Sequence, residues 1–105
     1  MNLVFHWDEN NRNHIAKHGI TPEEAEQIVN DDPIDITVNL RNREERTVQI
    51  GETDAGRVLL VVTTWRDEKV RVVTAYPAGK KLRELYSKLK GQSHVGGSQD
   101  SGLQE

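Results

Sequence analysis

Within 105 residues, this chain contains Lys, His, Glu, Arg and Tyr side chains that can transfer protons or bind phosphate. Together they could supply a base for a 2′-hydroxyl, cations around a phosphorus and an acid for a leaving oxygen, which are the parts that cleavage of RNA without a metal ion needs. Histidine exchanges protons near neutral pH, and arginine holds phosphate through two parallel N–H groups. Residues of these types are more often surface charges or buried phenols, so their positions in the fold must decide their roles. The candidates are Lys17, His18, Glu45, Arg46, Arg66, Arg71 and Tyr76.

His14 and His18 are four residues apart, which is the spacing of two metal-binding histidines on one helix face. The residue after His14 is Ile15 rather than the glutamate of the HExxH motif, and the chain has no cysteine. We therefore expect no metal site and no cofactor. The Lys-His pair that ends at His18 is explained equally well by the helix dipole, which favours cations in a last turn.

The two tryptophans, Trp7 and Trp65, have two interpretations. They are either core aromatics or platforms on which RNA bases stack. The core interpretation is the simpler one, and Trp7 is kept as a candidate for RNA binding.

Charge is distributed unevenly along the chain, although the net charge is only −3. Residues 1–40 carry two cations and eight acids, whereas residues 41–90, here called the basic half, carry twelve cations and seven acids. A basic surface of this kind attracts a polyanion. Ordinary solvated charges on helices and sheet edges explain the same counts.

The composition also indicates the cellular compartment and the number of domains. Without cysteine there is no disulfide framework and no thiolate metal site. The sequence shows no secretory leader pattern and no apolar run of membrane length. We expect a cytoplasmic protein with one domain over residues 1–90 and, from the Gly-, Ser- and Gln-rich composition, a disordered tail over residues 91–105.

A central pair of predicted strands, Arg57–Trp65 and Val70–Tyr76, must position the residues that could do chemistry. The first strand is almost continuously apolar, which is typical of a strand covered on both faces. In the second, alternation predicts Arg71, Val73 and Ala75 on one face. Val70, Val72, Thr74 and Tyr76 would then lie on the other.

The N-terminal region predicts a short strand and a helix. Leu3–Trp7 is the strand candidate, and Asp8 can cap a helix over Glu9–His18. Gly19 supplies the left-handed residue that commonly ends a helix.

A second helix is predicted from Pro22 to the Asp31-Asp32-Pro33 stop. Thr21 is its N-cap, and Glu24 three residues later completes a capping box. Ala25, Ile28 and Val29 form its apolar stripe.

The remaining pattern predicts two more strands and a closing helix. Residues 34–40 alternate regularly, and so do residues 46–50, where Val48 and Ile50 point inward. Residues 78–90 have helical spacing. The order is β-α-α-β-β-β-β-α, an α+β fold with an antiparallel sheet of four or five strands, two helices before it and one after. In the 34–40 strand the inward side chains would be Ile34, Ile36, Val38 and Leu40.

An ordered set of short motifs resembles the BrnT-type toxin family. It begins with FHWDENNRNHIAKHGITPEEA, continues with Asp31-Asp32-Pro33, Glu45-Arg46 and Gly51, and ends with Arg71-Val72-Val73-Thr74-Ala75, Ala78 and Tyr86. The resemblance covers about residues 3–86. Each piece is weak alone, and the order of the pieces makes the match specific. One departure is Tyr76, because the family has an arginine there; a phenol donates a hydrogen bond but has no permanent charge.

The resemblance implies a RelE-like fold and a metal-independent endoribonuclease that stops translation as the toxin of a type II toxin–antitoxin system. Its partners would be an RNA substrate and a BrnA-like ribbon-helix-helix antitoxin. That antitoxin would join in a heterotetramer of two toxins and two antitoxins and bind operator DNA. Lys17, His18, Glu45, Arg46 and Arg71 match family motif positions.

Two hypotheses follow. The first is an active ribonuclease with a concave basic surface joining Lys17, Arg46 and Arg71. The second is a catalytically inactive relative that only binds its antitoxin in autoregulation. In that second case Arg71 would form a surface ion pair, with Glu45 or Glu52 as candidate partners.

Overall fold

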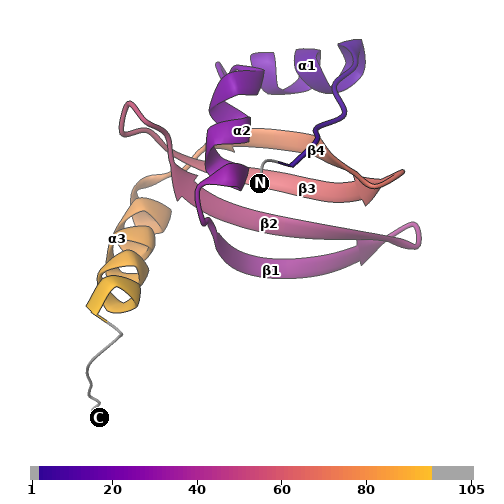
Figure 1. The fold of residues 1–105 in the computed structure, drawn as a ribbon. Helices are drawn as coiled ribbons and strands as arrows, with labels where there is room; N and C mark the ends of the chain where they lie inside the picture. Colours follow the sequence, from indigo (N-terminus) through magenta and orange to yellow (C-terminus); the bar gives the residue numbers. More distant parts are fainter. Residues whose placement is uncertain (1–2, 96–105) are drawn as a thin grey trace.

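The computed structural model describes residues 3–95 and has the order α-α-β-β-β-β-α (Figure 1). The strands form one antiparallel sheet in the order β1-β2-β3-β4. This confirms the predicted α+β class. The elements are α1 (Glu9–Ala16), α2 (Pro22–Asn30), β1 (Ile34–Arg41), β2 (Glu44–Glu52), β3 (Val58–Arg66), β4 (Lys69–Pro77) and α3 (Lys80–Val95).

The predicted first strand, Leu3–Trp7, is only an isolated bridge. Phe5 pairs in parallel with Val70 on β4, with backbone hydrogen bonds from His6 N to Val70 O at 2.8 Å and from Val70 N to Val4 O at 2.9 Å. The pairing stops there because Asp8 starts α1. The sheet of the described residues therefore has four strands rather than five.

Both N-terminal helices begin at the predicted caps. The Asp8 and Thr21 side chains accept hydrogen bonds from the third backbone N–H of their helices, at 3.0 and 3.1 Å. Each forms a capping box, with Asn11 and Glu24 as the reciprocal residues. The first helix ends at Ala16, two residues earlier than predicted, and Gly19 has the expected left-handed φ of 74°.

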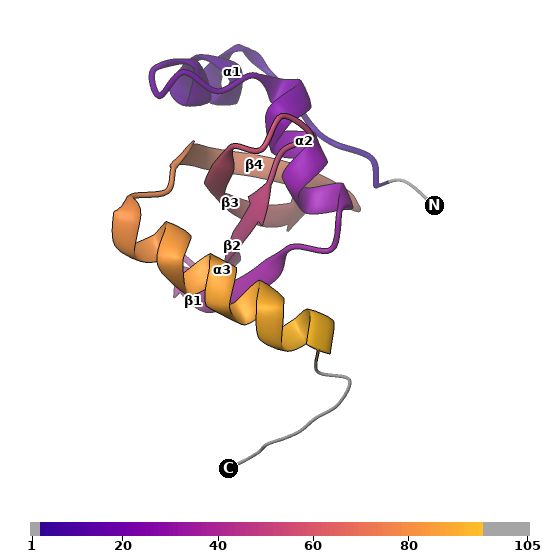
Figure 2. The same cartoon turned by 90° about the vertical axis from the view of Figure 1, so that its left-hand side faces the viewer.

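Strand β3 is covered on both faces, as predicted. One face packs into a core cluster built around Ile15, Ile28, Leu59, Val61 and Val72, and the other packs Leu60 with Ile50 and α3. Figures 1 and 2 show α1 beside β4, α2 across the sheet and α3 near β1.

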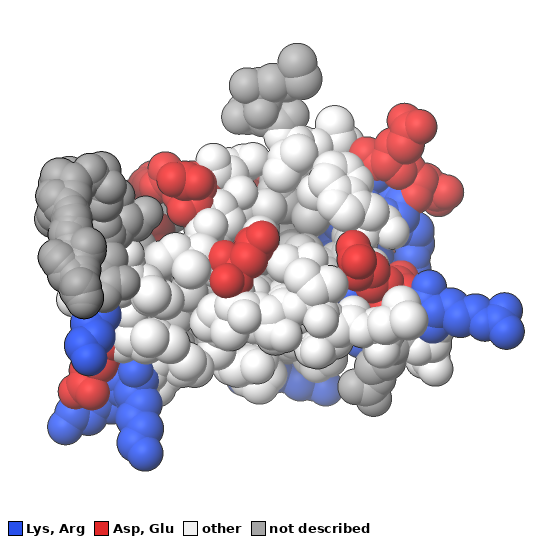
Figure 3. All heavy atoms as spheres, turned by 90° about the horizontal axis from the view of Figure 1, so that it is seen from below, with Lys and Arg blue, Asp and Glu red and all other residues white. Residues whose placement is uncertain are grey.

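A β-bulge in β1 overturns the predicted inward row of that strand. The register shifts between Asp35 and Thr37, so Ile34 pairs with Ile50 and stays in the core while later residues change face. Val38 and Leu40 are therefore exposed, at 54% and 76%. Ile36 is also exposed. Figure 3, which looks onto the β1 side, shows a largely uncharged surface whose Lys and Arg side chains lie mostly at its two ends.

A second bulge changes the predicted faces of β4. The register shifts beyond Val72, so Arg71 pairs with Thr64 and Tyr76 pairs with Leu60. Thr64 and Leu60 lie on the same face of β3 because they are four residues apart. Arg71 and Tyr76 therefore share a face, contrary to the alternation, whereas Ala75 joins Val72 in the core.

The last helix is longer than predicted. It continues through Gly91 to Val95, so its end is five residues beyond the predicted Lys90. The rest of the predicted tail, residues 96–105, lies outside the described residues. None of the helices within residues 3–95 is long and apolar enough to cross a membrane.

The close approach of α2 to β2 at Gly51 gives a stability prediction. A methyl group at this position would lie 3.0 Å from Cγ2 of Ile28. We expect Gly51→Ala to destabilise the fold by about 1–3 kcal/mol through overpacking, which thermal unfolding would report as a fall of about 4–8 °C per kcal/mol.

The control is Gly91→Ala in α3, where an added methyl meets nothing within 4 Å. Alanine is the better helix former there and should stabilise by about 0.5–1 kcal/mol. Equal melting temperatures for wild type and Gly51→Ala would contradict the tight α2–β2 contact.

Candidate functional site

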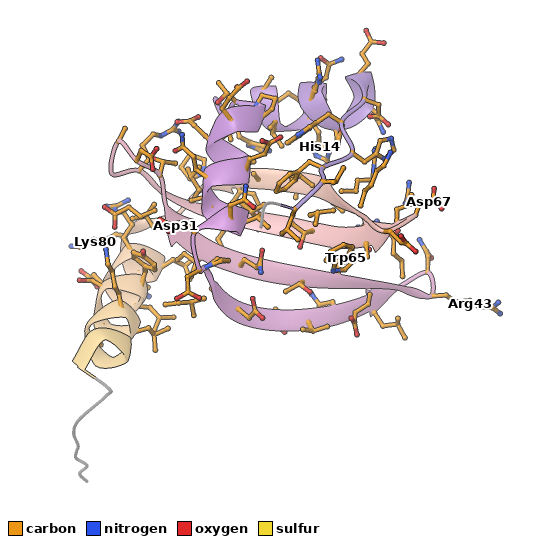
Figure 4. All side chains as sticks on the ribbon, viewed as in Figure 1. His14, Asp31, Arg43, Trp65, Asp67 and Lys80 are labelled. Atoms are coloured by element: carbon orange, nitrogen blue, oxygen red, sulfur yellow. The ribbon has the colours of Figure 1, made fainter. Side chains whose placement is uncertain are left out.

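A small polar groove lies where α1 meets the sheet. Its volume is about 230 Å³, and arginines from three strands line it together with α1. Figure 4 shows His14 on α1, above the sheet. The lining residues are Asn10, Asn11, His14, Arg46, Arg66, Arg71 and Val73.

Arg71 is the most buried charge of the groove, with 8% of its surface exposed. Its Nη1 donates to Asp8 Oδ2 at 2.9 Å and lies 3.4 Å from His6 Nδ1, and its Nη2 lies 3.4 Å from Asp8 Oδ1. The hydrogen bond from Arg71, followed by that from the Asn11 backbone, lowers the pKa of Asp8 to about 2. The ion-pair partner of Arg71 is therefore Asp8, not Glu45 or Glu52.

The other two groove arginines share one carboxylate. Glu44 Oε1 accepts from Arg46 Nε at 3.3 Å and Nη2 at 3.2 Å, while Glu44 Oε2 accepts from Arg66 Nη2 at 2.8 Å. The Arg66 hydrogen bond, followed by the Arg46 one, lowers the pKa of Glu44. All three groove arginines are thus held in defined orientations.

Three aromatic rings form a row beside the groove. The ring centroids of Tyr76 and His18 are 5.8 Å apart, and those of His18 and His14 are 6.3 Å apart. Because His14 also lines the groove, this row connects Tyr76 and His18 to the arginines.

The structure brings Arg46, Arg66 and Arg71 together, and His18 and Tyr76 adjoin them through His14. It does not place the other three predicted residues in the groove. Lys17 is the exposed C-cap of α1. Glu45 alternates with Arg46 and so points to the other face of β2. Trp7 donates from Nε1 to Glu26 Oε2 at 2.7 Å and lines a separate cleft between α1 and α2.

Sequence reasoning missed His14, Asp8 and Glu44 as parts of this site. The i, i+4 spacing of His14 and His18 places both on one helix face. This signal fits a shared site as well as the metal site that the sequence argues against. Nothing local signals that Asp8 holds Arg71 or that Glu44 holds Arg66, because these partners are 63 and 22 residues apart. Glu44 and Arg46 are only two residues apart on β2, but the predicted strand began at Arg46 and so left Glu44 out. Among residues 3–95, no group of three His, Cys, Asp or Glu residues is placed to hold a metal ion.

Comparison with known families gives a match over residues 7–81 to the family described as ribonuclease toxin, BrnT, of type II toxin–antitoxin system. The chain belongs to this BrnT family. A comparison with curated proteins gave no match.

Membership of the BrnT family makes the ribonuclease toxin class and the need for an antitoxin partner properties of this chain. The matched segment contains the whole sheet, α1 and α2. Every residue that lines the groove therefore lies within the part of the chain that carries the family resemblance.

The Asp8–Arg71 pair makes stability depend on pH in acid. The folded-state pKa of Asp8, about 2, is below its ordinary value of 3.8, so the pair stabilises the fold above pH 4. This stabilisation is lost as the pH falls from about 4 towards 2. Asp8→Asn keeps an N-cap side chain. Its melting temperature should be lower than that of wild type at pH 6, and the difference between the two melting temperatures should shrink by pH 2.

Thermal unfolding of both proteins between pH 2 and 7 measures this difference. Asp54→Asn, an exposed carboxylate in the β2–β3 loop, is the charge-matched control. A constant difference between Asp8→Asn and wild type across that range would show that the pair does not produce the pH dependence.

Proposed function

We propose that this chain is a metal-independent endoribonuclease that holds an RNA phosphate in the groove of Arg46, Arg66 and Arg71. The observation that supports this is the convergence of three arginines from three strands on one groove with a histidine at its wall. Arginine matches the geometry of phosphate oxygens, and fixed cations stabilise the charge that builds on phosphorus during cleavage.

The histidines supply the proton transfers in this proposal. His14 takes the proton from the 2′-hydroxyl, whose oxygen attacks the adjacent phosphorus. The bond from phosphorus to the 5′-oxygen breaks, leaving a 2′,3′-cyclic phosphate. The leaving oxygen receives a proton from the His18–Tyr76 side of the aromatic row, so no co-reactant is needed.

Tyr76 stands at the position where the family pattern has an arginine, and we propose a different role for it. The bulge in β4 puts Tyr76 on the same face as Arg71, and its ring lies against His18. A phenol in this position can hold His18 in place and donate a hydrogen bond. The groove keeps three guanidinium groups without a cation at position 76.

We further propose that the toxin acts in the cytoplasm by cutting RNA needed for translation. A BrnA-like ribbon-helix-helix antitoxin would neutralise it in a complex of two toxins and two antitoxins that binds operator DNA. An inactive relative that only binds antitoxin is the competing function. Growth arrest on expression of the toxin without its antitoxin separates the two, because only the active enzyme causes it.

The phosphate role of Arg71 is tested by Arg71→Lys. Lysine keeps a charge for Asp8 but lacks the two-pronged phosphate contact, so RNA cleavage should fall by about 10²–10³. Cleavage of single-stranded RNA in the presence of EDTA measures this and tests metal independence in the wild type at the same time.

Arg57→Lys is the matched control, because Arg57 forms a comparable ion pair with Glu24, at 2.8 Å, outside the groove. It should cleave like wild type. Full activity in correctly folded Arg71→Lys would remove Arg71 from the phosphate site, and loss of wild-type cleavage in EDTA would refute metal independence.

The antitoxin should cover the groove in the basic half, since this silences the enzyme directly. Arg46→Glu and Arg66→Glu should slow association with the antitoxin, and the slowing should grow as salt is lowered, because screening weakens at low ionic strength. Stopped-flow association rates at several salt concentrations, with Arg83→Glu in α3 as the control, measure this. Equal rates for groove and control variants at low salt would place the antitoxin elsewhere.

A further inference from the structure

We propose that Glu44 is a positioning residue that aligns Arg46 and Arg66 on the RNA phosphate. The family motif position Glu45 does not have this role. The inference rests on the proposed ribonuclease function and deepens it, because it assigns the acidic residue of the site.

The contacts of Glu44 connect two strands of the groove. Its two carboxylate oxygens accept from different arginines, Oε1 from Arg46 and Oε2 from Arg66. Arg46 is two residues further along β2, on the same face as Glu44. The antiparallel register that pairs Thr47 with Thr63, continued by three residues, brings Glu44 opposite Arg66.

The hairpin geometry at this end of the sheet keeps Glu44 in place. The β1–β2 turn has Asn42 and Arg43 in left-handed conformations, with φ of 52° and 65°, so Glu44 begins β2 immediately after a two-residue turn. Figure 4 shows Arg43 and Asp67 at two hairpin tips at the same end of the sheet.

Glu45 cannot substitute for its neighbour. It pairs with Leu40 in the sheet and projects from the face opposite to Glu44 and Arg46. Its backbone oxygen accepts the Thr64 hydroxyl at 2.7 Å, which is a structural contact that does not depend on the side chain.

The carboxylate of Glu44 has two opposing effects on the reaction. It fixes the directions of two guanidinium groups before RNA arrives, which lowers the cost of organising the transition state. It also places a negative charge beside the phosphate, which weakens binding of the RNA backbone. Removing the charge of Glu44 should therefore lower kcat and at the same time tighten RNA binding. A variant that was only less stable would not show these two opposite changes.

The experiment compares Glu44→Gln, Glu44→Asp and Glu45→Gln with the wild type, with Glu84→Gln in α3 as the charge-matched control. It measures kcat and KM on an RNA oligonucleotide. It also measures the Kd of a single-stranded DNA oligonucleotide, which has phosphates but no attacking 2′-hydroxyl.

Glutamine has one acceptor oxygen in place of the two that bind different arginines, so kcat of Glu44→Gln should fall by about 10²-fold. Its Kd for DNA should fall by about threefold or more. Glu44→Asp, which restores the charge on a shorter stem, should return the DNA affinity to that of wild type and recover part of kcat.

Three outcomes would overturn the inference. The first is a kcat of Glu44→Gln close to that of wild type. The second is a large fall in kcat for Glu45→Gln with no fall for Glu44→Gln. The third is a fall in kcat of Glu44→Gln that only parallels a lower melting temperature. Wild-type RNA cleavage separates these from failure of the proposed function, because a wild type that does not cleave RNA refutes the ribonuclease assignment and this inference together.

Discussion

The contact between Asp8 and Arg71 connects the first helix, α1, to the edge strand β4 of the sheet. The same carboxylate caps α1 and holds Arg71, a buried arginine of β4. Asn11, the partner of Asp8 in the capping box, also donates to the carbonyl oxygens of His6 and Val72, at 3.0 and 3.1 Å. One helix start therefore sets the position of α1 over β4, and with it the wall of the groove that carries His14.

The groove is basic in residue type but largely neutralised in its local charge. Two carboxylates, Asp8 and Glu44, are paired with three arginines. Such pairing holds the long, flexible arginine side chains in fixed orientations before the substrate binds. It also weakens their attraction for phosphate, because each carboxylate adds a negative charge. Three of the twelve cations in residues 41–90 therefore form an organised cluster in the groove.

Two β-bulges decide which side chains meet. The bulge in β4 moves Tyr76 to the face of Arg71, and the bulge in β1 moves Val38 and Leu40 away from the core that holds Ile34. An extra residue in one strand reverses the facing of everything after it. Both bulges lie in the two edge strands, where one side of the strand has no neighbouring strand of the sheet to enforce a regular ladder.

Local signals in the sequence were sufficient for the order of the three helices and the four strands of the sheet, both N-terminal helix caps, the doubly covered strand β3 and the family. Caps, turns and periodicity depend on residues within a few positions of each other, so a single sequence records them. The three arginines were also visible as phosphate-binding candidates by type. Only the tertiary structure decided that His14 lies in the groove, that Glu44 also holds Arg66, and that Asp8 is the partner of Arg71. These contacts depend on strand register and on packing between segments that are far apart in the sequence, which local alternation does not record.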